Sequence, residues 1–313
     1  MNPNPLVSIL IPNYNKGSFI KETLDSVLNQ SFSNWECIIV DDHSTDDSWE
    51  IMEVYAHLDS RFKIFKRPLE RRKGGNAARN FGFEQSKGEY INWLDSDDIL
   101  SENFLDDKLM IFHKEPQLDL VYSDIREFTE NIKKAKVIDR LDLLKDYINP
   151  PLEYMRGNFW IQTGLPLFKK SYLKNYSKYF DENLLMGQEA EFFIRLLLDK
   201  PNLKFCPDSI MYYRRHQESY MTNFYQLPFS EKYLLTYLPN KLHFIEFWKK
   251  NKLTPETLNF FRNVFNDMLL FLPVFSTEFW DLLFLGTRHN LFKGRFQGVK
   301  ILGIRVLKSV KLI

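Results

Sequence analysis

The first 125 residues alternate between two patterns of hydrophobic positions. Short apolar, β-branched runs are each followed by a longer stretch whose apolar residues recur at helical spacing, as Ile20, Leu24 and Val27 do. The runs predict strands at residues 7–11, 38–40, 62–65, 90–94 and 118–122, and helices at 19–30, 48–57 and 77–85. This rhythm predicts an α/β fold with a mostly parallel central sheet and helices on both faces.

The pattern then becomes looser and finally changes. Up to residue 225 it predicts turns at Pro150-Pro151 and Pro207, a helix at 189–198 and a strand at 210–214. From Pro228 onward the apolar spacing is helical and rich in Phe, Leu and Trp. We therefore expect a boundary near Leu227, with a domain at 1–227 and a helical C-terminal extension at 228–313.

Composition is that of an ordinary globular protein. Apolar residues make up 44% and charged residues 27% of the 313 residues, which excludes a disordered or fibrous chain. The net charge of +1 gives no reason to expect a nucleic-acid partner. Cys37 and Cys206 lie far apart in apolar contexts, which favours free thiols in a reducing compartment. The sequence shows neither a signal peptide nor an uninterrupted apolar span, so we expect a cytoplasmic protein.

Charge is distributed unevenly along the chain. Residues 286–313 contain seven Lys or Arg residues and no acid. Within 298–313, one helical face is apolar, at Val299, Leu302, Val306, Val310 and Ile313. Residues 290–313 could therefore make peripheral contact with the inner face of an anionic membrane. They could equally dock on the aromatic helices that precede them, and both alternatives stay open.

Polar clusters follow the predicted strands, at the sheet edge where α/β proteins bind ligands. The first strand ends in a turn, Pro12-Asn13-Tyr14-Asn15, and the second is followed by Asp41 and Asp42. Ser44 and Asp46 suffice to cap the next helix. A carboxylate at Asp41 or Asp42 could instead accept hydrogen bonds from a nucleobase imide or a ribose hydroxyl.

The fourth strand is followed by the densest acidic cluster, Asp95-Ser96-Asp97-Asp98. Three carboxylates in four positions repel one another unless a cation or hydrogen-bond donors compensate them. An Asp-x-Asp pair suits one divalent cation, Mn²⁺ or Mg²⁺, whose other ligands are water and substrate phosphates. A plain surface loop is the structural alternative.

A glycine turn lies upstream, at Gly74-Gly75, and opens a predicted helix. Its backbone N–H groups and the cations at 71–73 suit a diphosphate. A solvated basic loop is the alternative for the three cations. Neither a Walker A loop nor a GxGxxG fingerprint is present, which argues against an NAD-dependent enzyme.

Taken in order, these motifs resemble the inverting nucleotide-sugar glycosyltransferases of family 2, which have the GT-A fold. The resemblance covers about residues 5–220, through VSILIPNYN, IIVDDHSTDDS, GGNAARNFG, KGEYINWLDSDD, GQEAEFFIRL and YRRH. It implies a donor-binding half at 1–125 and an acceptor side at 126–227. It also implies metal-assisted transfer from a nucleotide diphosphate sugar, most often a UDP-sugar, to a glycan or lipid-linked glycan in bacterial cell-envelope polysaccharide synthesis.

Carried over position by position, the resemblance predicts the donor site. The implied nucleotide-sugar-binding residues are Pro12, Tyr14, Asp42, Asn76, Arg79, Asp95 and Ser96. Pro12 and Tyr14 resemble the loop that packs around the base, and Asp42 the carboxylate that contacts it. Asp97 resembles the direct metal ligand, while Asp95 would meet the ribose or a metal-bound water. His216 is similar to a position that reaches the metal or the diphosphate.

The general base follows from aligning the sequence on Arg195-Leu196. This places Gln188-Glu189 where the family usually has Glu-Asp, so Glu189 would take the proton of the acceptor hydroxyl. Glu191 is the rival, but two positions on a helix point about 200° apart, so both cannot face one site. The Glu-for-Asp change leaves a catalytically impaired nucleotide-sugar-binding protein as the alternative function.

Three aromatic residues precede the predicted base, Tyr154, Phe159 and Trp160. They could stack on an acceptor sugar, although packing into the core is the favoured explanation. The loops around residues 149–164 are expected to determine the acceptor.

Overall fold

The computed structural model describes residues 4–138, 144, 150–156, 158–176, 179–184 and 188–217. All of them belong to the first of two compact units, Met1–Asn223, into which the chain divides. The predicted extension at 228–313 and the basic segment at 290–313 lie outside the described residues. Within the part that is described, no helix has the length and apolar character needed to cross a bilayer.

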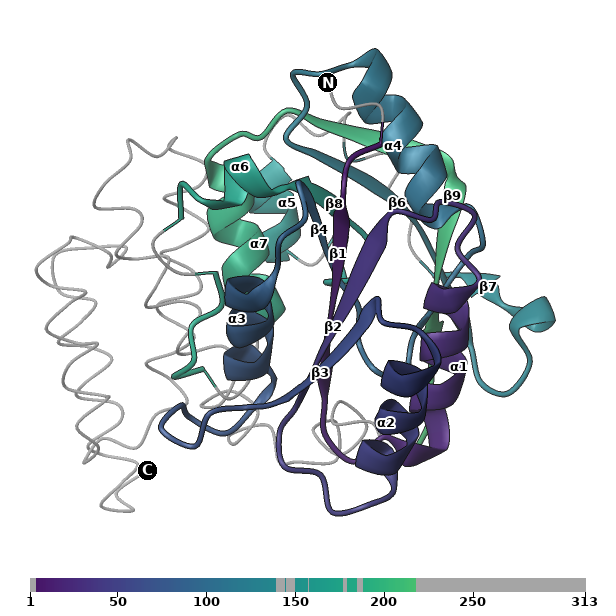
Figure 1. The fold of residues 1–313 in the computed structure, drawn as a ribbon. Coiled ribbons are helices and arrows are strands. Elements are labelled where there is room, and N and C mark those ends of the chain that lie inside the picture. Colours follow the sequence, from purple (N-terminus) through teal and green to yellow (C-terminus); the bar gives the residue numbers. More distant parts are fainter. Residues whose placement is uncertain are drawn as a thin grey trace, which may run out of the picture. The chain divides into compact units, whose positions relative to one another are not determined.

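The first half follows the predicted alternation of strand and helix (Figure 1). Its elements are β1 (Val7–Asn13), α1 (Gly17–Leu28), β2 (Trp35–Asp41), α2 (Ser48–Leu58), β3 (Phe62–Lys66), α3 (Gly75–Gln85), β4 (Tyr90–Trp93), β5 (Ile99–Leu100) and α4 (Phe104–Lys114). The second half contains β6 (Leu120–Phe128), η1 (Ile132–Lys134), β7 (Lys136–Val137), α5 (Pro150–Arg156), β8 (Leu167–Lys169), α6 (Lys170–Leu173), α7 (Gln188–Leu198) and β9 (Leu203–Arg214).

The described strands form one sheet in the order β3-β2-β1-β4-β8-β6-β9-β5, with β7 paired to β6. β1 pairs in parallel with both β2 and β4, and β6 pairs in parallel with β9. β8 is antiparallel to its neighbours β4 and β6, so β1 to β4, β6 and β9 all run the same way. The mostly parallel sheet is therefore confirmed.

Helices cover both faces of this sheet. Figure 1 shows α1, α2 and α4 on one side of the strands and α3, α5 and α7 on the other. On the second face Trp93 packs against Phe83, Phe180 and Phe192 at ring-centroid distances of 5.2–6.0 Å. The strand order reverses between β1 and β4, which opens a ligand crevice at the carboxyl ends of these strands.

Both predicted proline turns are wrong. Pro150-Pro151 begins α5, because proline fits the first turn of a helix, where its missing N–H needs no partner. Pro207 lies inside β9, at a bulge where the register jumps from Cys206 opposite Ser123 to Ile210 opposite Asp124. An irregular point of a strand tolerates a residue without an N–H group.

Helix α4 and strands β5 and β8 are absent from the prediction. α4 buries Lys108 completely among apolar residues, and this charge interrupts the apolar stripe by which a helix is recognised. The Lys108 ammonium donates to the carbonyl of Leu165. β5 and β8 contain only two and three residues, too few for a hydrophobic period to show.

Candidate active site

The acidic cluster after β4 lies beside the carboxyl end of β1, and each of its carboxylates has different partners. Asp97 faces the start of α1 and the end of β9: its Oδ2 lies 2.7 Å from Lys16 Nζ and 3.0 Å from His216 Nε2. The His216 ring packs on Phe19, 4.2 Å between centroids. Burial alone would raise the pKa of Asp97, but the His216 hydrogen bond and the Lys16 ammonium hold it below its ordinary value.

The residues around Asp97 fit a divalent cation. Lys16 Nζ also lies 3.4 Å from His216 Nε2, so one positive group already stands beside a carboxylate oxygen and an imidazole nitrogen. Both atoms are ligands that Mn²⁺ accepts, and such sites take their remaining ligands from phosphates and water. Among the described residues, no group of three or more His, Cys, Asp or Glu side chains could hold a metal ion. Asp97 Oδ2 and His216 Nε2, which lie 3.0 Å apart, are the protein atoms that could hold such an ion.

Asp95 is bound on both oxygens. Its Oδ1 accepts from the buried Arg79 at 2.6 Å, and its Oδ2 accepts from Gln162 Nε2 at 3.0 Å. Asp95 and Arg79, both predicted to bind the donor, thus form one ion pair between β4 and α3. Because Arg79 Nε has no partner among the described groups, part of its donor capacity is not used by Asp95.

Asp98 is completely buried and has a structural role. It accepts from Gln162 Nε2 and from the backbone N–H of Arg214, each at 3.0 Å, which ties the β4 loop to β9. Burial and the charges of Asp97 and Asp95 raise the pKa of Asp98 well above its ordinary value. Gln162 is absent from the predicted site, because an isolated glutamine in a loop carries no pattern.

The two acids after β2 are also held by the protein itself. Asp41 accepts from Asn13 Nδ2 at 3.0 Å and from Ser44, and so joins the loops that follow β1 and β2. Asp42 is buried, pairs with Arg67 and accepts from the N–H of Gly74 at 2.8 Å. The predicted contact of Asp42 with the nucleobase would therefore be made by a carboxylate that is already bound to Arg67 and to the Gly74 N–H.

The loop predicted to surround the base is partly exposed. Tyr14 is 41% exposed, and Lys73 Nζ lies 4.3 Å above its ring and 3.0 Å from its hydroxyl oxygen. Pro12 is the sixth residue of β1, opposite Val40. Gly74 has a φ of +133°, a conformation that favours glycine, and its N–H is taken by Asp42 rather than free for a phosphate.

Two asparagines of α3 hold the segment that leads to α7. Asn76 Nδ2 donates to the carbonyl of Asp181 at 2.6 Å, and Asn80 Nδ2 donates to that of Phe180 at 2.8 Å. Asn76, predicted to bind the donor, thus positions a backbone segment with its amide. Ser96, also predicted, is buried and accepts from Thr23 Oγ1 through its carbonyl at 3.1 Å.

Glu189 lies in the first turn of α7 and is partly buried. Its Oε1 accepts from Thr163 Oγ1 at 3.2 Å, and Trp160 provides a second hydrogen bond. Burial, strengthened by the charge of Asp95 and opposed by Arg79, raises its pKa to about 7. A carboxylate with this pKa can exchange a proton at neutral pH.

Glu191, the rival base, is committed elsewhere. It is buried and forms a bidentate pair with Arg195, at 2.5 Å from Nε and 2.8 Å from Nη2. The geometry therefore supports Glu189 over Glu191 as the group that faces the carboxylate cluster.

The three aromatic residues near the base divide into two kinds. Tyr154 and Phe159 are buried and pack edge to face, 5.3 Å between centroids, as the core explanation predicts. Trp160 is half-buried, packs on Tyr213 with 5.7 Å between ring centroids, and donates a hydrogen bond to Glu189.

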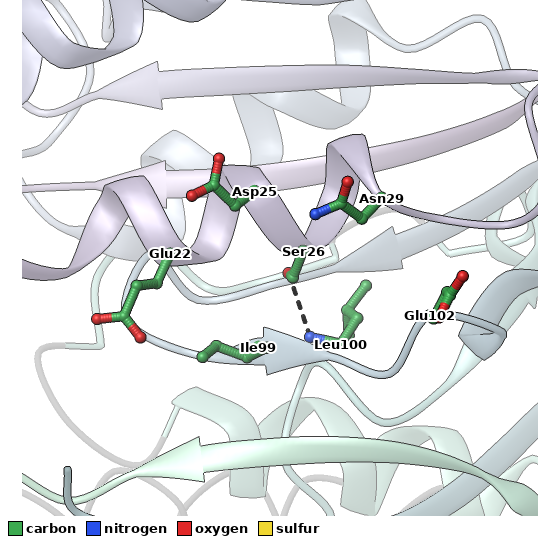
Figure 2. A pocket seen from close by; sticks show the side chains of 7 residues that line it. All are labelled: Glu22, Asp25, Ser26, Asn29, Ile99, Leu100 and Glu102. Carbon is green, nitrogen blue, oxygen red and sulfur yellow. Dashed lines mark hydrogen bonds between the residues drawn. The ribbon is translucent and has the colours of Figure 1, made fainter. Parts of the chain in front are cut away.

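A pocket of about 490 Å³ lies between α1 and β5. Figure 2 shows the residues that line it: Glu22, Asp25, Ser26, Asn29, Ile99, Leu100 and Glu102. None of them is a predicted site residue. Asp25 is paired with Lys21 and Tyr55, and Glu22 with Arg214. Because none of the predicted site residues lines this pocket, the carboxylate cluster remains the candidate site.

Comparison with known sequences points to one family. The model described as Glycosyl transferase family 2 matches residues 8–218, which include every predicted site residue. Poly(ribitol-phosphate) beta-N-acetylglucosaminyltransferase TarP of Staphylococcus aureus is 30% identical over 214 residues, 64% of this chain and 60% of TarP. Glycosyltransferases of Bacillus subtilis, Haemophilus influenzae and Streptococcus pneumoniae are 41–43% identical over 102–108 residues. The match spans 33–42% of the length of these three relatives.

Solved structures show the same fold. TarS of S. aureus in complex with UDP-GlcNAc gives a TM-score of 0.62 at 19% identity, covering 98% of this chain and 91% of TarS. The mannosyltransferase PcManGT of Pyrobaculum calidifontis, in complex with GDP-Man and Mn²⁺, gives 0.55 at 15% identity, covering 100% and 82%. At these identities the likeness shows a GT-A fold and no more.

Proposed function

Because this chain belongs to glycosyl transferase family 2, we propose that it transfers a sugar, with inversion, from a nucleotide diphosphate sugar to a hydroxyl of a glycan or lipid-linked glycan. The UDP-GlcNAc bound to TarS supports UDP as the carrier. The name of TarP, a poly(ribitol-phosphate) glycosyltransferase, supports a cell-envelope polymer as the acceptor.

The observation that carries this proposal is the position and pKa of Glu189. Its carboxylate is near the Arg79–Asp95 pair, and its pKa of about 7 suits a general base. In the proposed step the acceptor oxygen attacks the anomeric carbon from the face opposite the diphosphate. The bond from that carbon to the diphosphate oxygen breaks, the electron pair leaves with the diphosphate, and the hydroxyl proton moves to Glu189.

The negative charge of the leaving diphosphate needs compensation. A divalent cation, when bound, would stabilise it as a Lewis acid. Asp97 and His216 would hold this cation, and the Mn²⁺ in PcManGT supports its identity. Arg79 would contribute a fixed positive charge beside Asp95.

Replacing the base tests the proposal. Glu189→Gln is expected to lower transfer by a factor of about 10²–10⁴, the usual contribution of a general base. UDP-sugar binding, followed by thermal shift with Mn²⁺, should persist. Glu50→Gln, on the exposed side of α2, is the matched control and should act as wild type. Full turnover by Glu189→Gln would contradict the proposal.

The alternative of a catalytically impaired binding protein has its own test. A live site should slowly release nucleoside diphosphate from the donor in the presence of Mn²⁺, with water as the acceptor. If the wild-type protein binds a UDP-sugar but releases no UDP, the alternative replaces the transferase proposal.

Membrane contact through residues 290–313 also stays a proposal. Removal of these residues should abolish sedimentation with anionic liposomes, since the segment combines basic residues with an apolar face. Equal sedimentation of the full and shortened chains would contradict it.

A further inference from the structure

The ammonium group of Lys16 lies beside the two atoms that could bind a metal ion, Asp97 Oδ2 and His216 Nε2. It is 18% exposed, and its ammonium lies 2.7 Å from Asp97 Oδ2 and 3.4 Å from His216 Nε2. The other two acids of the cluster have different partners: Asp95 has Arg79 and Gln162, and Asp98 has Gln162 and the Arg214 N–H. Lys16 is therefore the cation that serves Asp97.

The backbone of Lys16 is fixed independently of this contact. Its N–H donates to Ser48 Oγ at 2.9 Å, and its carbonyl accepts from the N–H groups of Phe19 and Ile20 at the start of α1. The side chain makes no hydrogen bond that caps the helix. Its four-carbon stem can thus change direction without disturbing α1.

Resting on the function proposed above, we infer that Lys16 is the resting cation of the Asp97–His216 pair and must leave when a divalent cation binds there. The Lys16 ammonium, 2.7 Å from Asp97 Oδ2, repels a divalent cation held by that carboxylate and by His216 Nε2, so the two cations compete for this pair. Two protein ligands alone bind a divalent cation weakly, so phosphates of the donor would supply the rest.

This exchange would couple the metal to the donor. In the donor-free protein Lys16 competes for Asp97 and keeps metal affinity low. In the donor complex the phosphates add ligands and outweigh Lys16. Because coupling between two ligands is reciprocal, the nucleotide and the metal should each raise the affinity of the other.

The first test measures Mn²⁺ binding without any sugar transfer. Lys16→Met keeps an unbranched side chain and removes the charge. Free Mn²⁺ is followed by electron paramagnetic resonance during titration of the full-length wild type and the variant, without and with UDP. We expect Lys16→Met to bind Mn²⁺ about tenfold tighter than wild type without UDP. Removing the unit charge of the neighbouring ammonium should favour the metal by about 1.4 kcal/mol, which corresponds to this factor.

Two further variants isolate the effect. Lys21→Met removes the same charge from an exposed pair with Asp25 on the same helix and should leave Mn²⁺ affinity as in wild type. Adding Asp97→Asn to Lys16→Met should cancel the tenfold gain. Thermal unfolding of each variant verifies that it is folded.

The outcomes separate this inference from the proposed function. If Lys16→Met and wild type bind Mn²⁺ equally without UDP, Lys16 does not compete and the inference is overturned, while metal-assisted transfer stands. If UDP leaves the Mn²⁺ affinity of wild type unchanged, the coupling is overturned. If no variant binds Mn²⁺ even with UDP, the metal assignment and the inference fail together, although Glu189→Gln still tests the base.

Discussion

In the half proposed to bind the donor (the donor half, residues 4–125), the three acids predicted to bind the nucleotide or the metal each lie against a cation. Asp42 pairs with Arg67, Asp95 with Arg79 and Asp97 with Lys16. In the half proposed to bind the acceptor (the acceptor side), Glu189 accepts hydrogen bonds from the neutral side chains of Thr163 and Trp160.

This difference separates two chemical tasks. A carboxylate paired with a cation acts through its charge, which suits the proposed donor and metal binding. Glu189 is partly buried and forms no ion pair with any residue that the structure describes, so its pKa rises to about 7 and it can take and release a proton. The following substitutions change the partners of these carboxylates, first in the donor half and then around Glu189.

The largest expected effect comes from removing the cation of Asp95. In Arg79→Gln, the Asp95 carboxylate, which is only 23% exposed, keeps Gln162 as a partner but loses its cation. We expect the free energy of unfolding to fall by about 3 kcal/mol, the lower end of the range for breaking a buried pair. The measurement is unfolding in urea.

A second substitution makes this result specific. Arg79→Gln with Asp95→Asn should recover most of the loss, because no unpaired charge remains. Lys21→Met, at the exposed pair on α1, is the control and should unfold as wild type does. A loss below about 1 kcal/mol in Arg79→Gln would mean that the donor half does not depend on charge pairing.

The next effect concerns the acceptor side and its pH dependence. Because the pKa of Glu189 is raised to about 7, the base is protonated below that pH and ionised above it. Donor turnover should therefore fall about tenfold per pH unit as the pH drops below 7, and level off above it. A flat profile from pH 5.5 to 8 would remove Glu189 as the base.

Thr163→Val sharpens this prediction. The Thr163 hydroxyl stabilises the ionised carboxylate, so its loss should move the midpoint of the profile up by about 0.7 pH units, the equivalent of a hydrogen bond of about 1 kcal/mol. Thr129→Val, at an exposed position, should leave the midpoint unchanged. An equal shift in both variants would show that the hydrogen bond to Glu189 is not the cause.

The two halves also differ in how far sequence alone predicts them. In the donor half, β1 to β4 and α1 to α3 follow from clear hydrophobic periods, whereas α4 and β5 do not, and the strand-end motifs fall at one edge of the sheet. On the acceptor side Pro150-Pro151 and Pro207 each fit two local structures, and tertiary pairing decides between them.

Within the site, periodicity cannot distinguish neighbours. Asp97 and Asp98 are adjacent acids, yet one faces Lys16 and His216 while the other is buried under Gln162 and Arg214. The outcome depends on β9 and on the loop before β8, which are distant in sequence. The roles of Gln162, Arg67 and Lys16 likewise depend on contacts between segments that are distant in sequence, so no local pattern predicts them.

The smallest expected effect is on nucleotide affinity in the donor half. Tyr14 is the exposed aromatic residue after β1 that is predicted to pack around the base. Tyr14→Ala should weaken UDP binding about fivefold, since stacking on a base contributes about 1 kcal/mol at the low end of its range. Tyr14→Phe keeps the ring and loses only the contact of Lys73 with the hydroxyl, so it should bind UDP as wild type does.

Calorimetric titration with UDP in the presence of Mn²⁺ measures both variants. The midpoint of the pH profile should stay near 7 in each, because Tyr14 is not among the groups that raise or lower the pKa of Glu189. If Tyr14→Ala binds UDP as tightly as wild type does, the nucleobase does not stack on Tyr14. A shifted midpoint would instead mean that donor binding and proton transfer are coupled, and that the two halves do not act through separate charges.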